Sequence, residues 1–200
     1  MIHVGERAFY EEVVDRLQDC QVVLCEGVRS PTTTLLTMSY RFFADNPKLG
    51  LVLQKSVGLE NLEDRLVHAD VCGEAFEKRW SKLPVWSRLF RPMIAPIFGL
   101  CLRIFGTREY IARHLHLELR TSREEILSDE SFKGVNEIIL DWRDQHLLEV
   151  MDHELAKLAG KNACIGIVYG ARHMRAVLSH LLRIHGYRVA KTEWLTVWTL

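Results

Sequence analysis

The stretch ACIGIVYGARH, which runs from Ala163 to His173, decides the predicted fold of this 200-residue chain. Its first seven residues form an apolar run that is typical of a strand buried on both faces of a sheet. Gly170 follows at once. The next segment, Arg172 to His185, carries apolar residues at helical spacing. A strand that leads directly into a helix indicates βαβ connections, so this stretch predicts an α/β domain with a mostly parallel sheet flanked by helices.

Further elements lie on the N-terminal side of this unit. A long helix is predicted over Phe132–Leu158, since apolar side chains recur along one side of it. The run from Val22 to Cys25 predicts a second buried strand, preceded by an amphipathic helix over Glu6–Leu17. Ser30 followed by Pro31 is a helix-start signal, and this helix is expected to run to about Phe43. Weaker strand patterns occupy Leu49–Gln54, Val67–Cys72 and Arg188–Trp198. We expect a single domain over residues 1–200.

The middle of the chain has a different character. Charged helical stretches surround a proline-broken apolar segment, Leu83–Phe105, and we expect residues 74–130 to form a helical insertion. This insertion would pack as a lid or a dimer arm over the strand ends. Three arginines flank the apolar groups of residues 83–105, namely Arg88, Arg91 and Arg103. We expect the apolar groups of this stretch to form the core of the insertion, and the flanking arginines leave contact with a membrane surface or a homodimer as the alternative. The uncharged run Pro92–Leu102 is too short to cross a bilayer, which takes ~20 residues.

Composition excludes several classes of protein. Lys and Arg together number 26, Asp and Glu also number 26, and the formal net charge is +0. A nucleic-acid binder with a basic surface is therefore not expected. The hydrophobic fraction of 48% excludes a disordered chain. The five cysteines contain no C-x-x-C pair, and the first ten residues lack the apolar core of a signal peptide. These features favour a cytoplasmic protein with reduced thiols.

Residues with catalytic chemistry follow two of the predicted strands. In parallel sheets functional groups gather at the carboxyl ends of the strands. Glu26 follows the run Val22–Cys25, and a carboxylate there needs a partner or a function, because an unpaired buried charge is costly. Gly170 opens a helix whose amides favour an anion, and His173 follows it. We predict that these two strand ends are adjacent, with Glu26 and His173 in side-chain contact or bridged by one water. Arg143 could hold Glu26, stabilise an oxyanion or lie at the surface.

Four segments, taken in order, resemble a known family. They are Ile2-His3-Val4-Gly5-Glu6, Val22-Val-Leu-Cys-Glu26-Gly27, Trp142-Arg143-Asp144 and Val168-Tyr-Gly170-Ala-Arg-His173. They resemble the TraB/GumN family, also called TraB/PrgY/Tiki, within the erythromycin-esterase/ChaN-like group. That family is marked by two G-x-x-H motifs, an early glutamate and a late arginine. The second motif is complete in Gly170 and His173. In the first, His3 matches but its glycine would precede Met1, so the first strand is expected to be missing.

The resemblance implies a hydrolase-like site made of His3, Glu26, Arg143 and His173. It further implies that His3, Glu26 and His173 bind a divalent metal, Mn²⁺, Co²⁺ or Zn²⁺, with Gly170 beside the cofactor. The family is chemically mixed, since Tiki-type members are metal-dependent proteases, erythromycin esterases use a histidine base and ChaN binds haem. Two hypotheses follow. Either activated water attacks the carbonyl of a peptide or small-molecule ester, or the fold binds a peptide or small ligand without catalysis.

Overall fold

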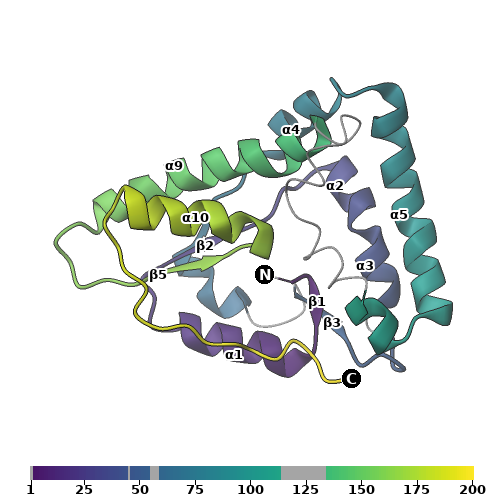
Figure 1. The fold of residues 1–200 in the computed structure, drawn as a ribbon, viewed down its shortest axis with the longest axis horizontal. Coiled ribbons are helices and arrows are strands. Elements are labelled where there is room, and N and C mark those ends of the chain that lie inside the picture. The colour runs from purple at the N-terminus through teal and green to yellow at the C-terminus, as the bar shows by residue number, and fades with distance from the viewer. Residues whose placement is uncertain (1, 45, 55–58, 114–133) are drawn as a thin grey trace.

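The computed structural model describes residues 2–44, 46–54, 59–113 and 134–200 (Figure 1). Its centre is a three-stranded sheet in the order β4-β2-β5. The strands are β2 (Val22–Cys25), β4 (Leu66–His68) and β5 (Ile165–Val168), and both pairings are parallel. The prediction of a mixed α/β fold with a parallel sheet is therefore confirmed, although the sheet is small.

The two strands with the clearest sequence patterns are direct neighbours. Cys25 of β2 is in register with Val168 of β5 on one side and with His68 of β4 on the other. The carboxyl ends of all three strands therefore meet at one edge of the sheet, as we predicted for β2 and β5. Val23 and Leu24 are fully buried because β2 is the central strand.

Helices cover both faces of this sheet (Figure 1). On one face α1 (Arg7–Leu17) and the 3-10 segment η2 (Leu59–Arg65) pack through Val14, Leu17 and Leu62 against Val23 and Val168. On the other face α9 (Trp142–Lys157) and α10 (Ala171–Arg183) pack through Leu147, Met151 and Val177 against Leu24. Alternate strand residues thus enter opposite cores, as a two-residue period requires. The turn η3 (Glu137–Asp141) is a π-helical turn that leads into α9.

A second sheet lies apart from the first. It pairs β1 (Val4–Gly5) with β3 (Val52–Leu53) in antiparallel fashion. His3 stands just before β1, so it is not at the carboxyl end of a strand of the parallel sheet. A strand before Met1 stays a prediction.

The C-terminal segment corrects another expectation. We predicted a strand over Arg188–Trp198, but this segment has no strand structure. It contacts the region around β1 through the hydrogen bond that the Glu6 amide donates to the carbonyl of Val197, at 2.9 Å. The alternating pattern failed as a guide because its apolar positions are not buried together; Trp194, for example, is 94% exposed.

The described part of residues 74–130 is helical where it has regular structure. It contains α4 (Gly73–Trp80), α5 (Val85–Phe105) and a helical segment over 108–113; residues 114–130 lie outside the described residues. The predicted helix from Pro31 is divided at Thr37 into α2 (Pro31–Leu36) and α3 (Met38–Phe43). α5 packs on α2 and α3, where Gly99 contacts the Ser39 backbone so closely that a Cβ would clash. The role of residues 74–130 as an insertion, lid or dimer arm stays a prediction.

Candidate functional site

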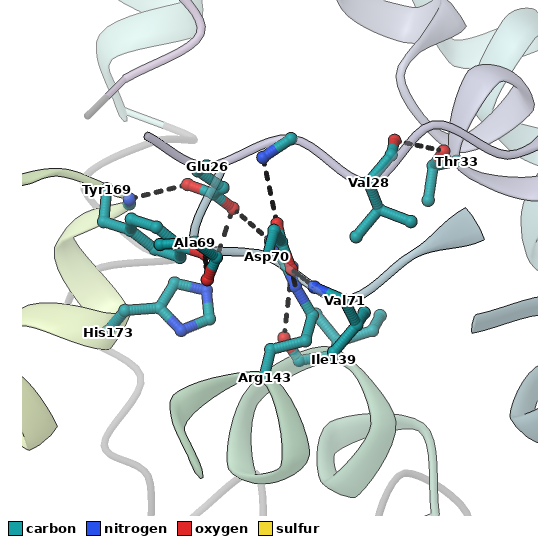
Figure 2. Close-up of polar contacts among 12 residues, drawn as sticks. Glu26, Val28, Thr33, Ala69, Asp70, Val71, Ile139, Arg143, Tyr169 and His173 are labelled. Atoms are coloured by element: carbon teal, nitrogen blue, oxygen red, sulfur yellow. Dashed lines mark hydrogen bonds and ion pairs between the residues drawn. The ribbon is translucent and has the colours of Figure 1, made fainter. Parts of the chain in front are cut away.

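Six polar or small residues meet at the carboxyl edge of the parallel sheet, and Figure 2 shows four of them, Glu26, Asp70, Arg143 and His173. Each strand contributes, because parallel strands end at the same edge. The first turn of α9 adds two more side chains to this edge. The residues are Glu26 after β2, Asp70 after β4, Gly170 and His173 after β5, and Arg143 and Asp144 from α9. The structure thus brings three of the four predicted catalytic residues into one cluster.

Arg143 is the cation of this cluster. Its guanidinium donates two hydrogen bonds to Asp70, from Nε to Oδ1 at 2.9 Å and from Nη2 to Oδ2 at 2.6 Å. Nη2 also donates to Glu26 Oε1 at 2.7 Å, and Nη1 donates to the carbonyl of Ile139 at 3.2 Å. The side chain is only 9% exposed, so these are buried, charge-assisted bonds. Of the roles considered for Arg143, the geometry favours holding Glu26 in place.

Glu26 is held from two sides. One oxygen binds Arg143, and the other accepts a hydrogen bond from the Gly170 amide at 2.7 Å. Burial alone would raise the pKa of Glu26, but the positive charge of Arg143, the charge of His173 and the hydrogen bond from Arg143 together outweigh it, so the pKa is lowered. Glu26 is therefore ionised at neutral pH. The sequence predicted an anion at Gly170, and in the structure the Glu26 carboxylate is an anion bound there.

His173 connects this network to α9. Its Nδ1 lies 2.6 Å from Asp144 Oδ1, and its Nε2 lies 3.8 Å from Glu26 Oε1. The predicted contact between Glu26 and His173 is present. An ionised Asp144 can only accept a hydrogen bond, so it places the proton of a neutral imidazole on Nδ1 and leaves Nε2 as the basic nitrogen. Tyr169 packs edge-on against the ring, with 5.3 Å between ring centroids.

His3 approaches from the antiparallel sheet. Burial lowers its pKa, while the negative charge of Glu26 acts in the opposite direction, so His3 is within electrostatic reach of the cluster. Its ring also lies 5.5 Å from that of Tyr40, measured between centroids. Among the described residues, no hydrogen bond or ion pair joins His3 to Arg143 or Glu26. Its predicted catalytic role stays a prediction.

The arrangement does not fit a metal held by His3, Glu26 and His173. Within the described part of the chain, these three donors do not form a group with all ligand atoms inside 4.8 Å of one another. In addition, both oxygens of Glu26 are already engaged, one of them by a guanidinium. A divalent cation at Glu26 would have to lie next to the positive charge of Arg143. We therefore route no chemical step through a metal at this edge.

The sequence patterns missed two residues of the cluster. Asp70 accepts from Arg143 and from the Gly27 and Val71 amides, at 3.0 and 2.9 Å for the amides. It fell inside the predicted strand Val67–Cys72, whereas β4 ends at His68 and leaves Asp70 at the edge. Asp144 adjoins Arg143 in a motif that we quoted, but no pattern indicated that it would face His173.

Comparison with known proteins identifies no relative: no family model matches the chain, and no curated protein or solved structure matches it. The resemblance to the TraB/GumN family therefore stays a prediction, and the function has to be argued from the geometry of the site.

Proposed function

We propose that this chain is a hydrolase in which His173 activates water for attack on a peptide or ester carbonyl. The observation that supports the proposal best is the buried Asp144–His173 pair, with Nδ1 2.6 Å from the carboxylate and Nε2 directed toward Glu26. This is the arrangement of a histidine base oriented by a carboxylate, the same division of roles as in catalytic triads. It corresponds to the metal-free, esterase-like branch of the family that the sequence resembles.

The reaction assigns one task to each side chain. His173 Nε2 takes a proton from water while the water oxygen bonds to the carbonyl carbon, and it then returns that proton to the leaving amine or alcohol. Asp144 keeps the ring in the required tautomer. The negative charge of Glu26, 3.8 Å from Nε2, stabilises the imidazolium that forms between these steps. Arg143 is a positioning residue, since it holds Glu26 and Asp70 without facing the reacting atoms.

Turnover measurements on matched variants test this proposal. Wild-type protein is assayed with p-nitrophenyl esters of increasing chain length and with fluorogenic peptides. His173→Ala is expected to lower kcat by roughly 10²–10⁴-fold, the usual contribution of a general base. His153→Ala is the control, because His153 is an exposed histidine of α9 outside the cluster. Equal turnover in the wild type and His173→Ala would refute a catalytic role for His173.

The alternative of a non-catalytic binding protein has its own support. The oxygens of Asp70 and Glu26 accept hydrogen bonds from within the protein, so the cluster is a closed ion network of the kind that also serves structure. On this hypothesis a peptide or small ligand binds at the edge without being changed. Saturable binding of a peptide in equilibrium dialysis, with no hydrolysis of any substrate class, would favour it over the hydrolase.

The exposed surface of α5 favours a second function, binding to anionic membrane surfaces. The helix contains no acidic residue, includes Arg88 and Arg103, and leaves many large apolar side chains at least 39% exposed. These are Val85, Trp86, Leu89, Phe90, Met93, Ile94, Ile97, Phe98, Leu100, Ile104 and Phe105. Basic and apolar groups together suit an anionic lipid surface. Within the described residues, no helix is both long and apolar enough to cross a membrane.

Sedimentation with vesicles separates the lipid proposal from a homodimer. We expect the protein to pellet with vesicles that contain phosphatidylserine and to stay in the supernatant with vesicles of phosphatidylcholine alone. Replacing Arg88 and Arg103 by Gln should reduce pelleting. A protein that ignores both vesicle types and sediments as a dimer in the ultracentrifuge would instead assign the α5 face to a second copy of the chain.

A further inference from the structure

A second cluster of metal-binding side chains lies away from the carboxyl edge, on α9, on α10 and on the segment that follows α10. His180 Nε2 and His185 Nε2 both lie within hydrogen-bond distance of Asp152 Oδ1, at 2.8 and 2.7 Å. The two imidazole rings are 5.2 Å apart between centroids. Asp152 comes from α9 and His180 from α10, which run side by side (Figure 1). The hydrolase proposal makes no use of these three residues.

The end of α10 explains how His185 reaches this position. The helix ends at Arg183, and Gly186 adopts φ +68°, a left-handed conformation that suits glycine. The Tyr187 amide then donates to the carbonyl of Leu181 at 3.0 Å, which closes the turn. The chain therefore turns back at the helix end, and His185 is placed beside His180 instead of continuing along the axis.

We propose that Asp152, His180 and His185 form a binding site for a divalent transition metal of the Zn²⁺ type. The three ligand atoms lie within 4.8 Å of one another, and no other such group of His, Cys, Asp and Glu occurs in the described part of the chain. Two imidazoles and one carboxylate are a ligand set that suits zinc, with a water in the fourth position. Ligands at zinc distances of about 2.0–2.1 Å lie roughly 3.3 Å apart in a tetrahedron, so the two His–Asp distances of 2.8 and 2.7 Å need only a small expansion.

The surroundings allow a metal to enter from solvent. The side chains of His180, His185 and Asp152 are 20%, 27% and 43% exposed. A bound ion would join α9 to the C-terminal end of α10 and to the segment after it.

Calorimetric titration with Zn²⁺ alone tests the site in the full-length protein after treatment with a chelator. We expect one Zn²⁺ per wild-type chain. His185→Ala and Asp152→Asn should each weaken binding by at least about 10-fold, since even loss of an outer-shell partner commonly costs that much. His153→Ala is the matched control, because His153 is exposed and adjoins Asp152 on α9. Absence of a Zn²⁺ site in the wild type, or unchanged affinity in both ligand variants, would overturn the proposal.

A further variant distinguishes this site from the carboxyl edge. His173→Ala should bind Zn²⁺ with wild-type affinity, because its imidazole belongs to the other cluster. Loss of Zn²⁺ binding in His173→Ala with retention in His185→Ala would place the metal at the edge and overturn the proposal. Circular dichroism of each metal-free variant establishes that it is folded, and His185, which follows α10, is the ligand whose removal disturbs no helix. A protein that hydrolyses no ester would count against the hydrolase proposal, but its zinc titration would still test the metal site.

Discussion

Helices α9 and α10 are joined by two Asp–His hydrogen bonds that have different surroundings. Asp144 and His173 form one of them, in the first turn of each helix, with side chains 11% and 5% exposed. Asp152 and His180 form the other, about two turns further along, with side chains 43% and 20% exposed. The bond lengths are 2.6 and 2.8 Å. The two pairs therefore have similar bond lengths, but His173 bonds its carboxylate through Nδ1 and His180 through Nε2, and the two pairs also differ in what lies next to them.

The neighbours of each pair indicate its chemistry. Beside His173 lie Glu26 and, beyond it, the guanidinium of Arg143, with side chains 14% and 9% exposed. This is a setting for proton transfer, because a nearby carboxylate stabilises the imidazolium. Beside His180 lies a second imidazole, His185, at a site open to solvent. This is a setting for a metal. We infer that the inner pair, Asp144 and His173, serves acid–base chemistry. The outer pair, Asp152 and His180, serves metal binding.

The largest expected effect is on turnover at the inner pair. Asp144→Asn replaces an acceptor by an amide that can donate to Nδ1, so His173 is held in the tautomer whose Nε2 carries the proton and cannot act as a base. We expect kcat to fall by roughly 10²–10⁴-fold while KM stays nearly unchanged. Steady-state kinetics on the best ester or peptide substrate measure both constants.

Asp152→Asn provides the control for this comparison, assayed under metal-free conditions. It makes the same change in the outer pair and should leave kcat unaltered, since Asp152 lies outside the carboxyl-edge cluster. Equal losses of kcat in the two variants would mean that the inner pair has no special role.

The next largest effect is on stability. Arg143→Met removes the cation that Asp70 and Glu26 share and leaves two buried carboxylates without it. Breaking a buried ion pair by removing one partner costs about 3–5 kcal/mol, so urea unfolding should show a loss of that order. Arg175→Met, on the exposed face of α10, should stay within about 0.5 kcal/mol of the wild type. A loss below about 1 kcal/mol in Arg143→Met would show that the network is not needed for folding.

These contrasts also show what the sequence could predict. The strands β2 and β5 are continuous apolar runs that both end in motif residues, and the prediction that they are neighbours, which the structure confirms, places Glu26 and His173 at the same edge of the sheet. For Arg143 the sequence left three roles open, and only the packed structure favours one of them, the contact with Glu26. For Glu26 and His173, local pattern and topology were sufficient.

The remaining residues depend on contacts that no local pattern encodes. β4 is three residues long and only partly buried, so its end, and with it Asp70, was misplaced. The position of His3 depends on the pairing of β1 with β3, which lie far apart in the sequence. The zinc-type cluster depends on the register of α9 against α10 as well as on the turn at Gly186. Helical periodicity predicts that two helices exist but not which of their residues meet.

A smaller effect concerns pH. The pKa values of Glu26 and Asp152 are both lowered in the folded protein, so each carboxylate contributes stability above its ordinary pKa, and this stability is lost as pH falls through the lowered value. The contribution of Glu26 should be the larger, because Asp152 is exposed and screened by solvent. Urea unfolding between pH 6 and pH 3, chosen as roughly the range in which carboxyls titrate, measures the acid-side slope.

Two substitutions resolve this slope into its sources. Glu26→Gln should flatten the acid-side slope clearly and Asp152→Asn only slightly, because Asp152 is the more exposed carboxylate. A single titrating proton changes the free energy of unfolding by at most about 1.4 kcal/mol per pH unit, which limits the size of either effect. A larger flattening in Asp152→Asn would reverse the assignment of the buried and exposed carboxylates.

Long-range ¹H–¹⁵N spectra of the histidine side chains during a Zn²⁺ titration test the division between the two pairs most directly. The account predicts that the ring nitrogen signals of His180 and His185 shift together and saturate at one equivalent of Zn²⁺, while those of His173 keep the chemical shifts of a ring with its proton on Nδ1. Zinc-dependent shifts at His173 or His3, with His180 and His185 unmoved, would contradict it.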